Sequence, residues 1–103
     1  MAFCDFALLM SDGSIPERVE LDARTHGKLV KWAESHKANA LIRASDIYGD
    51  EVEYADSELE ALRLDTSTMA AAPDRELAGI AVALLQLSDR ALHEKARVVF
   101  LPN

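Results

Sequence analysis

"PDRELAGIAVALLQLSDRALHEKARVVFLPN", residues 73–103, contains a long helical pattern that is followed directly by a strand pattern. Apolar residues recur at spacings of three and four from Leu77 to Leu92, which is typical of a helix with one buried face. Pro73 suits the first turn of that helix, because a residue there needs no partner for a backbone N–H. We therefore expect a helix over residues 73–95 at the centre of the core.

The run "RVVFL", residues 97–101, is almost continuously apolar, as in a central strand that is covered on both faces. Residues 2–10, at the other end of the chain, are also apolar at nearly every position, and Asp5 is the odd member. Because a carboxylate is costly to bury, we expect Asp5 near an end or an edge of the sheet. We expect the last strand to pair with the first.

A turn signal, Asp12-Gly13, follows the first strand, and alternating residues predict a second strand over 17–22. Asp22 can then cap a helix over residues 23–37. The two N-terminal strands form a hairpin, and the hairpin and the last strand together make a small sheet.

The middle of the chain is less regular. Residues 51–54 alternate and fit a short strand, and Ser57 with Glu60 matches the capping box of a helix over 57–66. Residues 66–72 leave two alternatives open, because their hydroxyl residues favour a break and their alanines favour a continued helix. The predicted fold is α+β: a small sheet formed from the N-terminal hairpin and the C-terminal strand, with three helices.

Length and charge limit the class of protein. The 103 residues form one domain, 1–103, because two separate cores would be too small to be stable. A net charge of −7 makes nucleic acid or an anionic membrane an unfavourable direct partner. Cys4 is the only cysteine, which suits a reducing cytoplasm, and neither a signal peptide nor a membrane-spanning run is visible. We expect a cytoplasmic, bacterial protein.

No catalytic or cofactor motif is recognisable, since the sequence has neither a Gly-rich phosphate loop nor a nucleophile elbow. His36 is interpreted as a partly packed helix residue, His26 and His93 as solvent-facing or helix-end residues, and Cys4 as a small buried hydrophobe. The carboxylates from Asp46 onward do not have the spacing of an EF-hand calcium loop. We therefore expect no enzyme, no cofactor and no metal site.

The most unusual stretch is "SDIYGDEVEYADSELEAL", residues 45–62, in which seven side chains are carboxylates and none is Lys or Arg. Like charges this close repel one another, which favours a binding role, while a plain solvated loop remains the alternative. Two tyrosines among them are the kind of aromatic anchor that binding hot spots use. The predicted partner-binding residues are Asp46, Tyr48, Asp50, Glu51, Glu53, Tyr54 and Asp56.

Two other surfaces suggest different functions. Val82 and Leu87 widen the apolar face of the long helix, which favours an interaction or regulatory module, including a homodimer. Arg24, Lys28 and Lys31 form a basic stripe, which we interpret as a solvated helix face opposite the core, with contact to an anion as the alternative.

Four stretches follow the hairpin in a fixed order: "LVKWAESH", "IYGDEVEYADSELEAL", "ELAGIAVALLQL" and "VVFLPN". In this organisation the chain resembles the small cytosolic immunity proteins encoded beside bacterial polymorphic and contact-dependent growth-inhibition toxins. The resemblance implies a non-enzymatic inhibitor that binds one cognate toxin, often a basic nuclease. The acidic surface would then act as a nucleic-acid mimic, with carboxylates where phosphates would lie.

Overall fold

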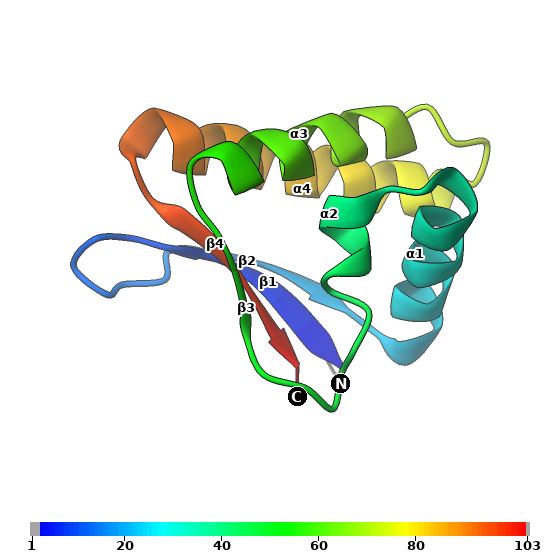
Figure 1. Cartoon of the computed structure of the whole chain (residues 1–103), viewed down its shortest axis with the longest axis horizontal. Helices are drawn as coiled ribbons and strands as arrows, with labels where there is room; N and C mark the ends of the chain where they lie inside the picture. The colour runs from blue at the N-terminus through cyan, green and yellow to red at the C-terminus, as the bar shows by residue number, and fades with distance from the viewer. Residues whose placement is uncertain (1–2, 103) are drawn as a thin grey trace.

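The computed structural model describes residues 3–102, which form four strands and four helices (Figure 1). The strands are β1 (Cys4–Leu9), β2 (Glu17–Leu21), β3 (Val52–Tyr54) and β4 (Arg97–Pro102). The helices are α1 (Ala23–His36), α2 (Asn39–Ile42), α3 (Ser57–Met69) and α4 (Arg75–Glu94). The α+β class is confirmed, and the short helix α2 is an addition to the three helices that the sequence predicts.

The strands form one antiparallel sheet in the order β2-β1-β4-β3. The last strand pairs with the first, as expected, with Phe6 opposite Phe100. The outer edge of β4 is taken by β3, where Glu53 lies opposite Val99. The sheet therefore includes a strand from the middle of the chain, and this strand places the acidic stretch at a sheet edge.

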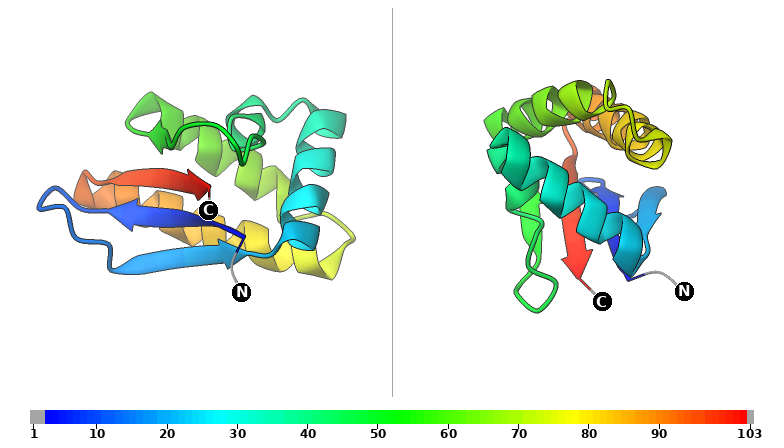
Figure 2. Two further views of the ribbon diagram at one scale, coloured as in Figure 1. Left: turned by 90° about the horizontal axis from the view of Figure 1, so that it is seen from below. Right: turned by 90° about the vertical axis from the view of Figure 1, so that its right-hand side faces the viewer.

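All four helices lie over one face of the sheet, and no helix of residues 3–102 covers the other face (Figure 2). Cys4, Phe6 and Leu8 are fully buried in the core between the sheet and the helices.

Asp5 is a buried carboxylate on β1, which is an interior strand of the sheet. Arg18 Nη1 donates to Asp5 Oδ2 at 2.8 Å across the strand pair. Asp5 thus lies near a strand end as expected, and an ion pair instead of open solvent balances its charge.

The long helix α4 supplies the centre of the core. Leu77, Leu84 and the other residues at helical spacing on its inner face are buried. Its N-cap is Asp74, which accepts hydrogen bonds from the backbone N–H groups of Glu76 and Leu77. Pro73 therefore precedes the cap instead of occupying the first turn, which corrects the predicted start by two residues.

Helix α1 begins where the sequence predicts. Asp22 Oδ1 accepts a hydrogen bond of 2.7 Å from the backbone N–H of Thr25, and this bond lowers the pKa of Asp22. Leu29 and Ala33 are buried on its inner face. The cap and the apolar spacing could both be predicted from the sequence, because each depends only on residues close together in the chain.

The basic stripe of α1 is largely exposed, as interpreted, but two of its cations are paired with carboxylates at the start of α4. Arg24 Nη2 lies 2.7 Å from Glu76 Oε2, and Lys28 Nζ lies 2.9 Å from Asp74 Oδ2. Two of its three cations therefore tie α1 to the first turn of α4, whereas Lys31 remains exposed. Their acceptors lie about 50 residues further along the chain, so the spacing of residues within α1 could not predict these ion pairs.

The predicted capping box of α3 is not formed. Asp56 is the N-cap, no side chain caps the helix, and Ser57 is already its first residue. Glu58 reaches back instead, and its Oε1 accepts from the backbone N–H of Ala55 at 3.4 Å. One hydrogen bond of the capping-box type therefore exists at the start of α3. It joins Glu58 to Ala55, two residues before the predicted pair of Glu60 and Ser57.

The open question over residues 66–72 has a divided answer, because α3 continues to Met69 and the break follows at residues 70–72. Thr66 Oγ1 donates to the carbonyl oxygen of Leu62 at 2.9 Å, and Thr68 makes the same type of bond one turn back. These bonds satisfy the hydroxyl groups inside a helix, so they do not force a break.

Candidate functional site

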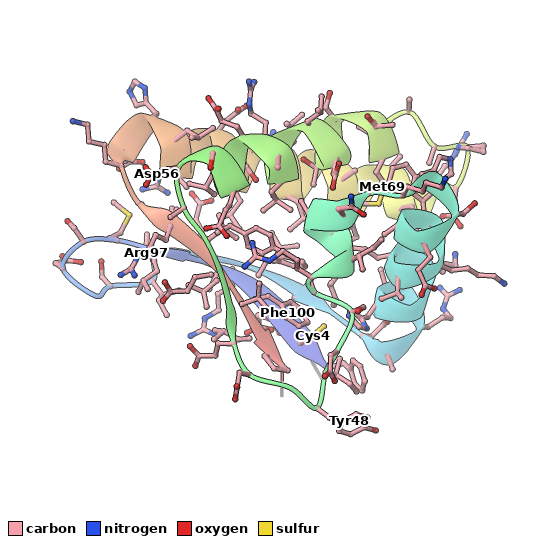
Figure 3. The ribbon with its side chains drawn as sticks, in the orientation of Figure 1. Cys4, Tyr48, Asp56, Met69, Arg97 and Phe100 are labelled. Atoms are coloured by element: carbon pink, nitrogen blue, oxygen red, sulfur yellow. The ribbon has the colours of Figure 1, made fainter. Side chains whose placement is uncertain are left out.

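The acidic segment, residues 46–56, runs along the open edge of the sheet. It starts in the loop after α2, passes through β3 and ends at the first turn of α3 (Figure 1). Figure 3 shows Tyr48 at one end of this path, directed away from the body of the protein, and Asp56 at the other end. We call residues 46–51 the loop tip and residues 53–58 the loop base.

The loop tip is held in place by contacts on its own backbone and by the core. Asp46 Oδ1 accepts a hydrogen bond of 2.9 Å from the backbone N–H of Tyr48. Gly49 passes so close that a Cβ there would lie 2.8 Å from Asp46 Oδ2. Ile47 packs against the core. The turn is therefore fixed, while the Tyr48 side chain, at 93% exposure, projects into solvent.

The loop tip presents negative charge that no cation in the described part of the chain pairs with. Asp46, Asp50 and Glu51 are all exposed, and none forms an ion pair within residues 3–102. Carboxylates in this state attract cations in solution, because no internal partner competes for them. Asp56, at the far end of the segment, is exposed and unpaired among the described residues in the same way.

The loop base is organised around Arg43, which the sequence analysis did not single out. Arg43 Nη1 donates to Glu58 Oε2 at 2.8 Å, and its Nη2 donates to the backbone carbonyl of Glu53 at 3.2 Å. Its Cζ also lies 4.8 Å from the centroid of the Tyr54 ring, a cation–π distance. One side chain from the end of α2 thereby links β3 and α3, and it occupies an acceptor on the edge strand.

The carboxylate of Glu53 forms an ion pair within the protein. Arg97 Nη1, on the neighbouring strand β4, donates to Glu53 Oε2 at 3.0 Å. Glu53 is a predicted partner contact, and its side chain is about half exposed (51%), but in this structure Arg97 already pairs with it. No local sequence signal reveals this pair, because its members lie 44 residues apart.

Tyr54 also differs from the expectation of an exposed anchor. Its exposed fraction is 0%, and its hydroxyl donates to the backbone carbonyl of Ala40 at 2.6 Å. Burial raises the pKa of Tyr54 well above its ordinary value. The ring is therefore part of the core that supports the segment, and Tyr48 is the aromatic side chain that the segment offers to solvent.

Asp56 has an unusual backbone conformation. Its φ of 50° and ψ of −116° lie in a region that side chains other than glycine rarely adopt. Strain of this kind costs roughly 1–3 kcal/mol and is often found at functional sites. The residue turns the chain from the end of β3 into α3, with its carboxylate in solvent.

A hollow of about 510 Å³ lies beside the loop base. It is lined by Asn39, Ala40, Arg43, Glu58 and Ala61, so α2 and α3 form its walls. The floor is mostly apolar, and the Arg43–Glu58 pair stands at its side. An amino-acid side chain of a partner fits a hollow of this size.

The other candidate residues do not assemble into a catalytic centre. Burial raises the pKa of the Cys4 thiol to about 11, so the thiol stays protonated at neutral pH, as expected of a packed hydrophobe. His26 is buried, which corrects its interpretation as solvent-facing, and its Nε2 donates to the carbonyl of Ala44 at 2.7 Å. Within the described residues, no group of three or more His, Cys, Asp or Glu could hold a metal ion.

The apolar surplus expected on α4 is smaller than predicted. Leu87 is buried in the core, and Val82 is exposed to 44%. Leu64 on the neighbouring helix α3 is exposed to 68%. A few exposed apolar residues are normal for a monomer and do not by themselves indicate a dimer interface.

Comparisons with known proteins give no further lead. A scan against protein-family models, a search of curated proteins and a search of solved structures each found no match. No helix in the part of the chain that the structure describes is long and apolar enough to cross a membrane.

Proposed function

We propose that this protein is a non-enzymatic inhibitor that binds a basic partner, a cognate toxin domain of the nuclease kind, through its loop tip. One observation carries the proposal: Asp46, Asp50 and Glu51 are exposed, none of them pairs with a cation of residues 3–102, and they flank Tyr48, whose side chain projects into solvent. The resemblance to immunity proteins supplies the class of partner. The inhibitor would act in the cytoplasm, where such a toxin is dangerous to the cell that makes it.

The loop tip suits fast recognition of a basic surface. Unpaired carboxylates steer a cationic partner during diffusion and raise the association rate. Tyr48 supplies a large ring that can be buried on contact, which is the usual composition of a hot spot. The Asp46 turn and the packing of Ile47 keep the loop ordered before binding, so that less conformational entropy is lost in the complex.

The same geometry explains how a nuclease would be blocked. A nuclease binds phosphates with Lys and Arg, and carboxylates at the loop tip would occupy those cations. The contact set that supports this proposal is Asp46, Tyr48, Asp50 and Glu51, with Asp56 at the other end of the segment. Glu53 and Tyr54 take the role of support, because Arg97 and the core hold them.

A charge-reversal experiment tests the proposal. The probe is the basic C-terminal domain of the secreted protein encoded by the neighbouring reading frame, and the variant is Asp50→Lys with Glu51→Lys. We expect the rate at which this variant associates with the probe at low salt to fall at least about tenfold. Cells that co-express the variant and the toxin domain should lose protection. Asp46 and Glu53 are left unchanged because they have internal contacts.

The matched control is Glu20→Lys with Glu34→Lys, which changes the net charge by the same amount at two exposed positions outside the segment. This control should retain fast association and protection. Equal association rates for the two variants would remove the loop tip as the binding site. A neighbouring frame that encodes no basic secreted protein would count against the toxin-inhibitor proposal itself.

A further inference from the structure

Two adjoining hollows lie where the second half of α1 meets the connection between α3 and α4. Their volumes are about 470 and 300 Å³, and both are lined by Trp32, His36, Asp74 and Leu77. They form one groove, which we call the Trp32 groove. It is separate from the loop tip and uses none of the residues of the acidic segment.

An aromatic pair forms the wall of the Trp32 groove. The rings of Trp32 and His36 are stacked, with centroids 4.3 Å apart and planes 17° apart. His36 Nδ1 lies 2.9 Å from the carbonyl oxygen of Trp32, so this nitrogen donates and holds the imidazole in place. Small residues, Ala71 and Ala72, line the facing side and leave room for a bulky side chain.

The rim of the Trp32 groove carries the spare positive charge of α1. Lys28 is shared between Asp74 and Glu76, whereas Lys31 is exposed and forms no ion pair within residues 3–102. Although the whole chain has a net charge of −7, Lys31 gives the edge of this aromatic groove a positive charge that is free to meet a carboxylate. The groove therefore suits an aromatic side chain flanked by carboxylates.

The loop tip has this chemistry. Tyr48 is an almost fully exposed ring, and the exposed carboxylates Asp46, Asp50 and Glu51 flank it in the sequence. We propose that the loop tip of one copy docks into the Trp32 groove of a second copy, with the Tyr48 ring against the aromatic wall and a carboxylate beside Lys31.

The two surfaces of this contact are different parts of the molecule, so the association is head-to-tail. A row of copies keeps one free loop tip at one end and one free groove at the other. The row therefore grows longer as the protein concentration rises, unless it closes into a ring. A contact of one ring and a few charges is smaller than the roughly 1,200 Å² of stable interfaces. Association is therefore weak and requires a concentration of about 0.1–1 mM.

This inference goes beyond the proposed inhibitor function and does not depend on it. Self-association covers the loop tip, so a basic partner that binds the loop tip dissociates the assembly. The groove residues lie outside the proposed toxin contact, and changing them leaves partner binding intact. The two proposals can therefore fail independently.

Sedimentation velocity over about 0.02–1 mM protein, with the fluorescence of Trp32 as a second readout, provides the first test. Trp32 is the only tryptophan of the chain, so its emission reports the groove directly. We expect the average sedimentation coefficient to rise with concentration and the emission to change in parallel. Raising NaCl to about 0.5 M should weaken association about fivefold, because the charges lie at the surface.

Two variants separate the halves of the contact. Tyr48→Ser removes the ring from the loop tip, and Lys31→Glu combined with Ala71→Glu makes the Trp32 groove acidic. Each variant alone should remain monomeric. A mixture of the two should form a dimer that does not grow, because only one intact loop tip and one intact groove remain per pair. Lys95→Gln, at the far end of α4, controls for the loss of a cation and should associate like the unchanged protein.

Three results would overturn the inference. The first is a strictly monomeric unchanged protein at about 1 mM and low salt. The second is association of either variant as strong as that of the unchanged protein. The third is a mixture of the two variants that stays monomeric while the unchanged protein associates, since a head-to-tail contact requires that pair to form.

Discussion

The loop tip and the loop base have nearly the same composition and opposite surroundings. At the tip, Asp50 and Glu51 meet no cation among the described residues, and Tyr48 stands in solvent. At the base, a carboxylate pairs with Arg43, and Tyr54 lies in the core. The charge density of a sequence therefore does not give the charge density of a surface, because the fold distributes cations unevenly along the segment.

The difference follows from where β3 lies. Pairing with β4 brings Arg97 next to Glu53, and the short helix α2 brings Arg43 against the inner end of the same strand. The loop before β3 extends beyond the sheet (Figure 1), and no cation of residues 3–102 forms an ion pair with its carboxylates. Stability and recognition are thus divided between two ends of one acidic stretch.

The two tyrosines give the largest expected contrast. Tyr54→Ala removes a fully buried ring and should lower the free energy of unfolding by about 3–5 kcal/mol. Tyr48→Ala removes an exposed ring and should change it by less than about 0.5 kcal/mol. Urea unfolding of both variants measures the contrast, and equal losses of stability would show that tip and base are not distinct.

Arg43→Ala should have the next largest effect. It removes hydrogen bonds to Glu58 and to the Glu53 carbonyl together with the contact over the Tyr54 ring, so we expect a loss of about 1–2 kcal/mol. Arg63→Ala is the control, because Arg63 makes one exposed pair with Asp89 at 3.6 Å, worth about 0–0.5 kcal/mol. A loss no greater than that of the control would refute the linking role of Arg43.

Asp56→Gly should stabilise the protein. Glycine adopts a φ of 50° and a ψ of −116° without strain, and after its own entropic cost we expect a gain of about 0.5–1 kcal/mol. Asp50→Gly, which removes the same charge at a position without positive φ, should give no gain. Thermal unfolding decides between them, and a destabilised Asp56→Gly variant would mean that the aspartate side chain itself supports this turn.

The smallest effect on stability belongs to the loop tip. Asp50→Lys combined with Glu51→Lys should shift the free energy of unfolding by less than about 0.5 kcal/mol, because both side chains lie in solvent and pair with no group of residues 3–102. Circular dichroism during thermal unfolding measures this directly. A clear stabilisation would instead indicate strong repulsion within the tip, and a loss above 1 kcal/mol would place these side chains in the supporting structure.

Local patterns were sufficient for most of the fold. The spacing of apolar residues in α4 and α1, the Asp22 cap and the pairing of the terminal strands were all correct. The errors arose where a distant residue decided the outcome. His26 became buried because α1 packs it against the carbonyl of Ala44 and beside the ring of Phe100. Arg24 and Lys28 of α1 likewise pair with carboxylates at the start of α4.

The sequence by itself determined the α+β class, the core faces of the long helices and the acidity of the middle segment, because these depend on periodicity and composition. Only the tertiary structure decided which carboxylates stay unpaired, which tyrosine is exposed and that Arg43 holds the segment together. Such facts depend on contacts between residues far apart in the chain, and no local pattern records which cation will be folded against which carboxylate.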